Sequence, residues 1–278
     1  MDMSIVIRCD DDERVFQCVD SVGEDVEIVV STSGGPEFLE RLSSAGITYC
    51  QTPRGNLSIV SNLGFARTRH DRVLITDSDT TFGKGCVREM YHALDAHKVA
   101  RSRIVFRRSG AQPFSGIIAE ARDYVNSLPL IYTPGIAVRK DILPDIGGFL
   151  FNEPVPYAVD ADLNYRIKRA KLAVGYPRKA VLYHDAESLW HDARAAHRIG
   201  RGCMISAISL SAHCRSDGKR PRDIARELKG VKPSQLKNVL STKGPSVFCY
   251  QIFWDSLFYA GMTREYLKAT FFGGTGVE

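Results

Sequence analysis

Asp77, Ser78 and Asp79 directly follow an apolar run at residues 72–76. A buried strand that ends in two carboxylates would form an oxygen-rich site of the kind that binds Mg²⁺ or Mn²⁺. In open α/β sheets, ligands bind at the carboxyl ends of the strands. A divalent cation held there could neutralise a substrate diphosphate and help it leave. Acidic triplets also form simple turns in which aspartates bond their own backbone, so the surrounding pattern decides between the two interpretations.

The residues before the triplet alternate between strand and helix patterns. Buried strands are expected at residues 4–7, 26–30, 47–51 and 72–76. Helices are expected between them, at 13–22, from Pro36 to Gly46, and at 56–66. This alternation predicts an α/β fold with a mostly parallel sheet and helices on both faces.

The rest of the chain is mixed and then mainly helical. A helix is expected at 84–97 and a strand at 103–107, followed by an irregular region that contains Pro113, Pro129 and Pro134. A helix at 160–170, a strand at 181–184 and a mainly helical pattern from residue 188 follow.

Composition limits the functions that fit. The chain has 278 residues, of which 44% are hydrophobic and 25% charged, as in ordinary globular proteins. A net charge of +5 does not by itself indicate nucleic-acid binding, and no nucleic-acid partner is expected. Seven cysteines without a C-x-x-C pair are typical of reduced thiols, and no signal peptide or membrane span is expected. The predicted location is therefore cytoplasmic.

Residues 194–243 are strongly basic. This stretch would attract an anionic partner such as a diphosphate, a lipid headgroup or a phosphate backbone, or it forms a solvated helical surface. Its acidic residues are Asp217, Asp223 and Glu227. Its basic residues are Arg194, Arg198, Arg201, Arg215, Lys219, Arg220, Arg222, Arg226, Lys229, Lys232, Lys237 and Lys243.

Further motifs follow one another in a recognisable order. They are Ser4-Ile5-Val6-Ile7-Arg8 with the acidic turn at 10–13, Arg54-Gly55, Asn62-Leu63-Gly64, the Asp77–Asp79 triplet, Gly147-Gly148-Phe149, Asp160-Ala161-Asp162-Leu163, His184, and the segment 198–202. In this order they resemble the inverting glycosyltransferases of family 2, which have the GT-A fold. The likeness runs from residue 4 to about residue 202.

The resemblance implies a division of the chain. It implies a GT-A domain at 1–202, with a nucleotide and metal half at 1–100 and an acceptor half at 101–202, and a helical extension at 203–278. The implied partners are a nucleotide-sugar donor and a hydroxyl acceptor, which could be a glycan, a lipid-linked saccharide or a small natural product. Mn²⁺ or Mg²⁺ is the implied cofactor.

The resemblance also implies roles at the donor site. Asp79 would bind the metal, and Asp77 would reach the ribose or the metal through water. His184 would be a further metal ligand or a phosphate contact, although a histidine at the end of a strand is often structural. The remaining donor-site candidates are Arg8, Asp10, Ser31, Asn62, Ser78, Arg198 and Arg201.

Several of these candidates have an alternative interpretation. Arg198 and Arg201 could grip the diphosphate or form a basic helix face. Gly200 and Gly202 would then allow the backbone to approach closely. Asn62 would stabilise the nucleotide loop or pack its helix.

Three departures from the family pattern concern the base and the acceptor motif. Ser31 stands where the family has an aspartate that reads the base, and Asp10 stands where an aromatic residue often stacks. Val159 replaces a glutamate before Asp160. The nucleotide identity therefore stays open.

Inverting transfer is a direct displacement that needs a carboxylate near the acceptor hydroxyl and positive charge near the diphosphate. The resemblance makes Asp160 the candidate base, with a helix N-cap as the alternative role. Asp162 would orient Arg166 or cap the helix.

The aromatic segment at 247–262 is apolar around most of its circumference. It predicts a helix buried in the core or at the interface of a homodimer. Contact with a lipid-linked acceptor at the inner membrane surface is the alternative.

Three other functions are alternatives to glycosyl transfer. Residues 73–80 also fit the first motif of haloacid dehalogenase-like phosphatases, in which Asp77 would be the nucleophile. That motif normally lies on the first strand, whereas three strand–helix units come first here. A nucleotidyltransferase would need a Gly-rich phosphate loop after the first strand, and this sequence has none there. A non-catalytic sugar-nucleotide or polyanion binder is the remaining alternative.

Overall fold

The computed structural model describes residues 1–108, 110, 112–213 and 219–271. Arg215 and Asp217 of the basic stretch and Cys214, one of the seven cysteines, lie outside the described residues. The chain divides into two compact units. The first comprises Met1–Val105, Ile131–Phe151 and Arg166–His184, and the second comprises Phe106–Leu130, Asn152–Tyr165 and Asp185–Glu278.

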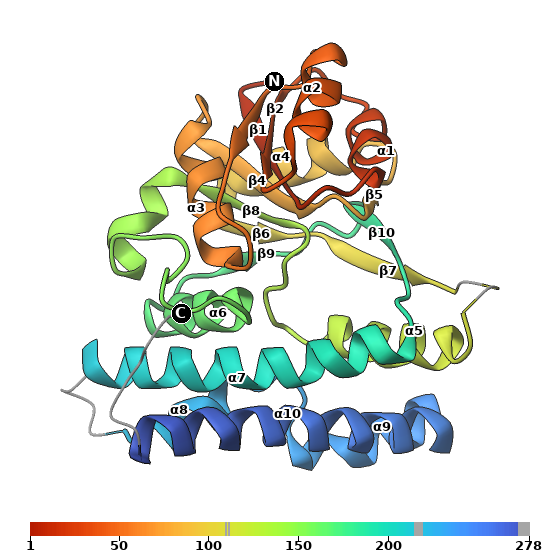
Figure 1. Cartoon of the computed structure of the whole chain (residues 1–278), viewed down its shortest axis with the longest axis vertical. Coiled ribbons are helices and arrows are strands. Elements are labelled where there is room, and N and C mark those ends of the chain that lie inside the picture. The colour runs from red at the N-terminus through yellow and green to blue at the C-terminus, as the bar shows by residue number, and fades with distance from the viewer. Residues whose placement is uncertain (109, 111, 214–218, 272–278) are drawn as a thin grey trace. The chain divides into compact units, whose positions relative to one another are not determined.

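A seven-stranded sheet forms the centre of the first unit (Figure 1). Its order is β3-β2-β1-β4-β8-β6-β9. Strands β3, β2, β1 and β4 run parallel, β8 is antiparallel to both β4 and β6, and β9 is parallel to β6. The strands span β1 (Met3–Cys9), β2 (Glu27–Thr32), β3 (Tyr49–Gln51), β4 (Arg72–Asp77), β6 (Val99–Arg101), β8 (Ile136–Arg139) and β9 (Val174–Gly175). The expected mostly parallel sheet is confirmed.

Four helices connect the strands in the first half of this unit. They are α1 (Arg14–Asp20), α2 (Pro36–Ser44), α3 (Leu57–Arg67) and α4 (Cys86–Ala96). Every residue of β1 is buried, which explains its unbroken apolar pattern in a strand paired on both sides. Asn56 caps α3 because its side chain accepts the N–H groups of Ser58 and Ile59 at 3.0 and 3.1 Å.

A second, three-stranded sheet has the order β5-β10-β7. Its strands are β5 (Thr80–Phe82), β7 (Arg103–Arg107) and β10 (Val181–Asp185). Strand β10 pairs antiparallel with β5, and His184 lies opposite Thr80. This pairing brings His184 next to the acidic triplet, which directly precedes β5.

One expectation about the middle of the chain is wrong. The region around Pro113, Pro129 and Pro134, expected to be irregular, contains helix α5 (Ser115–Ser127). Its inward face includes Ile118 and Tyr124. Pro113 and Pro129 flank this helix, so they bound it without interrupting it. The 3-10 helix η1 (Lys140–Ile146) follows β8.

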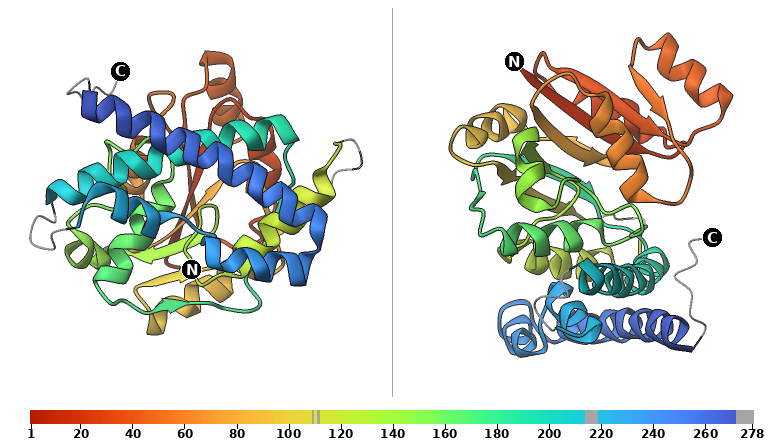
Figure 2. Two further views of the ribbon diagram at one scale, coloured as in Figure 1. Left: turned by 90° about the horizontal axis from the view of Figure 1, so that it is seen from below. Right: turned by 90° about the vertical axis from the view of Figure 1, so that its left-hand side faces the viewer.

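Helices dominate the second unit (Figure 2). They include α5, the first turns of α6 (Val159–Arg169), α7 (Leu189–His213), α8 (Pro221–Leu228), α9 (Leu236–Lys243) and α10 (Pro245–Phe271), with the 3-10 turn η3 (Pro233–Gln235) before α9. The domain boundary expected at residue 202 falls inside α7. Over the described residues, no helix is both long enough and apolar enough to span a bilayer.

Helices α7 and α10 cross at very close range. A Cβ atom added at Gly200 would lie 2.0 Å from the carbonyl oxygen of Phe258, and one added at Gly261 would lie 2.1 Å from that of His197. These two glycines therefore let the two backbones touch. A Cβ at Gly202 would likewise meet the Tyr157 carbonyl oxygen at 2.1 Å. The close approach expected at Gly200 and Gly202 is thus made to the protein's own backbone.

Candidate active site

Strand β4 delivers Asp77 to the carboxyl edge of the sheet, opposite Arg8 of β1. The Arg8 guanidinium meets Asp77 Oδ1 through Nε at 2.7 Å and Nη2 at 2.6 Å. Arg8 is only 4% exposed, whereas Asp77 is 27% exposed. Burial raises the pKa of Asp77 above its ordinary value, although the charge of Arg8 opposes that rise. The carboxylate is therefore tied to a buried cation.

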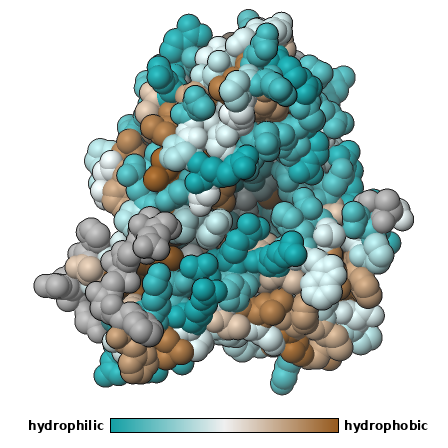
Figure 3. Space-filling model, in the orientation of Figure 1, coloured by the Kyte–Doolittle hydropathy of each residue, from teal (hydrophilic) through white to brown (hydrophobic). Residues whose placement is uncertain are grey.

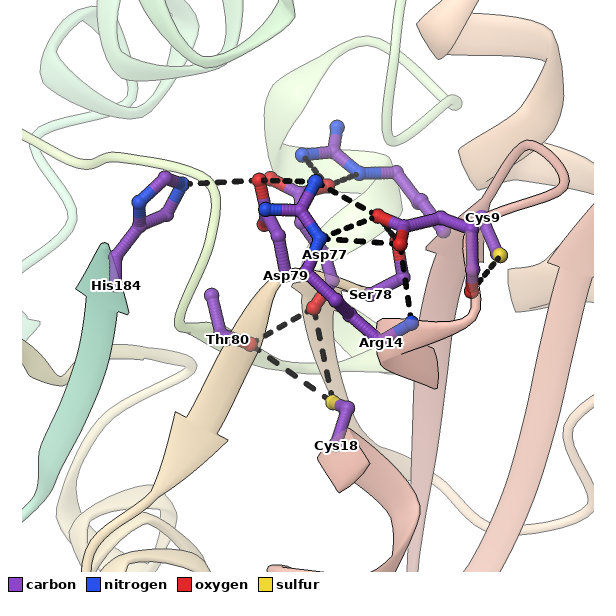
Figure 4. Close-up of polar contacts among 10 residues, drawn as sticks. Cys9, Arg14, Cys18, Asp77, Ser78, Asp79, Thr80 and His184 are labelled. Carbon is purple, nitrogen blue, oxygen red and sulfur yellow. Dashed lines mark hydrogen bonds and ion pairs between the residues drawn. The ribbon is translucent and has the colours of Figure 1, made fainter. Parts of the chain in front are cut away.

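Asp79 has one paired and one unpaired carboxylate oxygen (Figure 4). Its Oδ2 lies 3.2 Å from His184 Nε2 and 3.9 Å from Arg14 Nη2. Its Oδ1 is buried and has no hydrogen-bond partner among the described residues. Burial works against ionisation, but the hydrogen bond and charge of His184 and the charge of Arg14 outweigh it and lower the pKa of Asp79. An ionised oxygen without a partner is costly in the interior, so this atom is suited to bind a ligand.

The acidic turn after β1 packs against the triplet. Ser78 donates its backbone N–H to the Arg8 carbonyl at 2.9 Å and its hydroxyl to Asp12 Oδ2 at 3.2 Å. Asp12 in turn pairs with Arg14 Nη2 at 2.8 Å. Arg14, which reaches both Asp12 and Asp79, is absent from the residues predicted from sequence. It could have been found from sequence, because it is the first residue of α1 and directly follows the acidic turn that comes after β1.

Three predicted donor-site residues make contacts within the protein. Asp10 Oδ1 accepts from Arg54 Nε at 3.1 Å. Ser31 is fully buried and donates its hydroxyl to the Val60 carbonyl at 2.6 Å. Asn62 donates to the Phe151 carbonyl at 2.9 Å and accepts the Phe151 N–H at 3.1 Å. The packing role considered for Asn62 is therefore present, and donor contacts by these residues stay predictions.

Two thiols lie beside the triplet. Cys18 Sγ lies 3.6 Å from the Asp77 carbonyl oxygen, and Cys9 Sγ lies 3.6 Å from that of Asp12 (Figure 4). Burial raises the pKa of Cys9 to about 11 and that of Cys18 to about 12. Both thiols are therefore neutral at physiological pH and unsuited to act as nucleophiles.

In the second unit, Asp160 lies in the first turn of α6. The helix begins at Val159, so Asp160 is not the capping residue itself. Its Oδ1 nevertheless accepts the N–H of Ala161 at 2.9 Å, and its side chain is half-buried. Asp162 is fully buried and accepts the Ser206 hydroxyl at 2.8 Å. The two aspartates of this motif therefore differ in access, and only Asp160 is open to a substrate.

The two predicted diphosphate-binding arginines lie on α7 of the second unit. Arg201 Nε pairs with Glu265 Oε1 of α10 at 2.5 Å, and Glu265 is only 8% exposed. Arg198 lies over the Tyr157 ring, 5.4 Å from its centre. Arg201 therefore has a structural partner, and diphosphate binding by either arginine stays a prediction.

The donor set of the first unit fits a hard divalent cation only in part. No group of three or more His, Cys, Asp or Glu side chains is arranged to hold a metal in the part of the chain that the structure describes. Asp79 Oδ1 has no partner among the described residues, and the imidazole of His184 lies beside it, paired with Asp79 Oδ2. Mg²⁺ commonly uses one or two carboxylates and takes its other ligands from substrate phosphates and water. The residues therefore fit a cation that substrate helps to bind.

Residues 5–140 match the sequence model of glycosyl transferase family 2. The match covers just under half of the chain and assigns that segment to glycosyltransferase family 2. It favours glycosyl transfer over the phosphatase alternative for Asp77. Comparison with curated protein sequences gives no match.

The fold is similar to that of TarS from S. aureus. The 1–349 fragment of TarS in complex with UDP-GlcNAc has a TM-score of 0.57 and 16% identity, and the match covers 94% of this chain and 82% of TarS 1–349. A second structure of that fragment has a TM-score of 0.57 and 16% identity, with 97% and 81% covered. Identity this low shows a shared fold and no more. Together with the family match, it confirms the expected GT-A fold.

Proposed function

We propose that this protein transfers a sugar from a nucleoside-diphosphate donor to an acceptor hydroxyl, with inversion at the anomeric carbon. The observation that carries the proposal is the buried Asp79 carboxylate, whose Oδ1 has no partner among the described residues at the carboxyl edge of a GT-A sheet. In sheets of this kind, that edge is where ligands bind.

The first unit would hold the donor. Asp79 and His184 would bind Mn²⁺ or Mg²⁺, which would neutralise the diphosphate and so make it a better leaving group. Arg8 keeps Asp77 in place, and Asp77 would receive the ribose. Arg14, half exposed and 3.9 Å from Asp79, would add positive charge beside the diphosphate.

Asp160 would remove the proton from the acceptor hydroxyl while that oxygen attacks the anomeric carbon. The new carbon–oxygen bond forms as the bond from the sugar to the diphosphate breaks, and the electron pair leaves with the nucleoside diphosphate. A general base of this kind contributes about 10²- to 10⁴-fold to the rate.

UDP is the first nucleotide to test, because TarS of the same fold was solved with UDP-GlcNAc. Ser31 donates its hydroxyl to the Val60 carbonyl, so it is unsuited to recognise the base in the way the aspartate of the family does. The acceptor is proposed only as a hydroxyl compound. The free, mostly buried cysteines among the described residues suit a cytoplasmic location.

Calorimetry tests the donor site directly. UDP, GDP and dTDP would each be titrated with and without Mn²⁺ into wild type, Asp79→Ala and the control Asp71→Ala. Asp71 is an exposed carboxylate just before β4, at the opposite edge of the sheet. We expect one nucleotide to bind with a Mn²⁺ requirement that Asp79→Ala abolishes and Asp71→Ala leaves intact.

Activity tests the transfer itself. Wild type incubated with the matching nucleotide sugars and candidate hydroxyl acceptors should release the nucleoside diphosphate, and NMR of the product should show inverted anomeric configuration. Retained configuration would reject the inverting mechanism. If folded wild type binds none of the three nucleotides, the donor proposal is wrong, and nucleotide binding without transfer would favour a non-catalytic binder.

A further inference from the structure

Helix α10 presents an apolar stripe to solvent. Ile252, Phe253, Tyr259 and Leu267 are 42%, 41%, 38% and 44% exposed, and Phe271 at the end of the helix is 73% exposed. Ile252 and Tyr259 are seven residues apart, which places them on one side of the helix, and Phe253 lies beside them. Leu240 of the neighbouring α9 is 43% exposed. These six residues are called the outer stripe.

The outer stripe is not needed for the core of the second unit. The opposite side of α10 supplies Val247, Tyr250, Phe258 and Met262, all at least 92% buried in clusters with α5 and α7. In the view from below, α10 lies in front of α7 (Figure 2). Apolar side chains gather over α9 and α10 in Figure 3. This much exposed apolar surface on one helix is typical of a binding face.

The charges of α10 are sorted between its two sides. Its acidic residues, Asp255 and Glu265, have side chains only 10% and 8% exposed, and they pair with Lys229 and Arg201 at 2.6 and 2.5 Å. Its basic residues are exposed and are Arg264 and Lys268. The solvent side of α10 therefore combines aromatic and aliphatic side chains with positive charge only.

The neighbouring short helices add to this charge. Arg222 and Arg226 of α8 and Lys237 of α9 are exposed. Asp223 and Glu227 of α8 offset part of this positive charge. Arg226 Nη1 lies 3.8 Å from Asp223 Oδ1, and Lys219 Nζ lies 2.8 Å from Glu227 Oε1. The balance over the three helices remains positive.

We propose that the outer stripe and its basic flanks bind the surface of an anionic lipid bilayer. Interfacial helices insert an apolar face among the headgroups, while Lys and Arg beside it attract anionic lipids. The charge pattern argues against a second copy as the occupant, because a symmetric dimer through this face would oppose two sets of like charges. The proposal is independent of the glycosyltransferase activity.

Vesicle co-sedimentation tests the proposal with the full chain. Phosphatidylcholine vesicles with and without phosphatidylglycerol would be mixed with wild type, with Ile252→Ser/Phe253→Ser and with Arg264→Glu/Lys268→Glu. Matched controls are Leu63→Ser, since Leu63 is 41% exposed on α3, and Arg67→Glu/Lys84→Glu, two exposed basic residues of the first unit. Circular dichroism would confirm that each variant is folded.

We expect wild type to bind the phosphatidylglycerol vesicles and to be released by salt. Each basic residue near an anionic membrane contributes about fivefold to binding, so Arg264→Glu/Lys268→Glu should weaken vesicle binding by roughly 25-fold or more. Ile252→Ser/Phe253→Ser should weaken it by a factor on the order of ten. The two control variants should bind the phosphatidylglycerol vesicles within about twofold of wild type.

Three results would overturn the proposal. The first is folded wild type that stays in solution with both kinds of vesicle. The second is a loss of binding in the controls that equals the loss in the outer-stripe variants. The third is a dimer in analytical ultracentrifugation that Ile252→Ser/Phe253→Ser converts to a monomer, which would assign the face to a second copy.

Discussion

Arg8 and Asp77 lie opposite each other on the parallel strands β1 and β4, and the Arg8 guanidinium contacts one oxygen of Asp77 through two nitrogens. The aspartate that leads the acidic triplet is thus held by a cation from the neighbouring strand. Asp79, two residues later, has a buried carboxylate oxygen without a hydrogen-bond partner among the described residues.

Breaking this ion pair should cost stability. Arg8→Met would leave Asp77 without its cation and lower the free energy of unfolding by about 3 kcal/mol, the lower end for buried pairs because Asp77 is 27% exposed. Urea denaturation measures the loss, and Arg67→Met on the exposed side of α3 is the control. In a double-mutant cycle with Asp77→Asn, the stability lost by the double mutant should be smaller than the sum of the two single losses by about 1 kcal/mol or more. Strict additivity would show that the pair is not coupled.

Glu27 should make stability depend on acid pH. Although burial raises its pKa, hydrogen bonds from the Ser4 hydroxyl and Arg69 outweigh this and lower it below the ordinary 4.5. A carboxylate whose pKa is lower in the folded than in the unfolded state stabilises the fold at pH values above the unfolded-state pKa. That contribution is lost as the pH falls through the folded-state pKa. Near neutral pH, the free energy of unfolding of wild type should therefore be about 1–2 kcal/mol higher than that of Glu27→Gln.

Urea denaturation as a function of pH checks this prediction. The difference in the free energy of unfolding between wild type and Glu27→Gln should become smaller as the pH falls below 4.5. Glu37→Gln, at an exposed glutamate of α2, should show no such narrowing. A gap that widens in acid would mean that the folded pKa of Glu27 is raised.

Asp160 and Asp162 should separate activity from stability. Asp160→Asn should lower turnover by about 10²- to 10⁴-fold while leaving nucleotide binding unchanged, because a general base acts on the acceptor. Asp162→Asn should instead lower the free energy of unfolding by about 1–2 kcal/mol, since the buried Asp162 accepts the Ser206 hydroxyl at 2.8 Å. Steady-state kinetics, calorimetry and thermal unfolding of both variants make the comparison. Full turnover in Asp160→Asn would exclude it as the base.

Arg166 should be irreplaceable by lysine for structural reasons. Its guanidinium donates to the carbonyls of Ile146, Phe149 and Leu150 at 2.9, 2.9 and 2.6 Å and lies over the Phe149 ring. Lysine cannot reproduce this planar fork, so Arg166→Lys should cost about 2–3 kcal/mol. Thermal unfolding would be compared with Lys168→Arg, an exposed position on the same helix. Equal melting temperatures would contradict the prediction.

The role of Arg166 also shows where local pattern stops being informative. Its spacing from Asp162 favours an arrangement in which the aspartate orients it or caps the helix, and that stays a prediction. The structure adds partners that spacing does not reveal: Arg166 donates to carbonyls of the loop at 146–150, and Asp162 accepts from Ser206, forty-four residues away. Both are buried polar groups that must find partners, but which partner each finds depends on how α6 packs.

The amino-acid sequence by itself determined the four parallel strands β1, β2, β3 and β4 and the position of the acidic triplet, but not the strands β6, β8 and β9. Apolar runs such as residues 72–76 and caps such as Asn56 act within a few residues, so local pattern is enough to reveal them. The same is true of the family motifs between residues 5 and 140. Helix α5 is harder to see from local pattern, because the prolines on both sides of it are typical of irregular chain and obscure the signal of its apolar face.

Only the tertiary structure decided what surrounds the triplet. His184 reaches Asp79 because β10 pairs with β5 across about a hundred residues, and Arg8 reaches Asp77 because of the register between β1 and β4. Strand order and register are set by the packing of the whole sheet, which no local pattern encodes. The burial that leaves one oxygen of Asp79 unpartnered among the described residues has the same origin. Chemistry at this site therefore rests on residue types found in the sequence and on contacts that only folding creates.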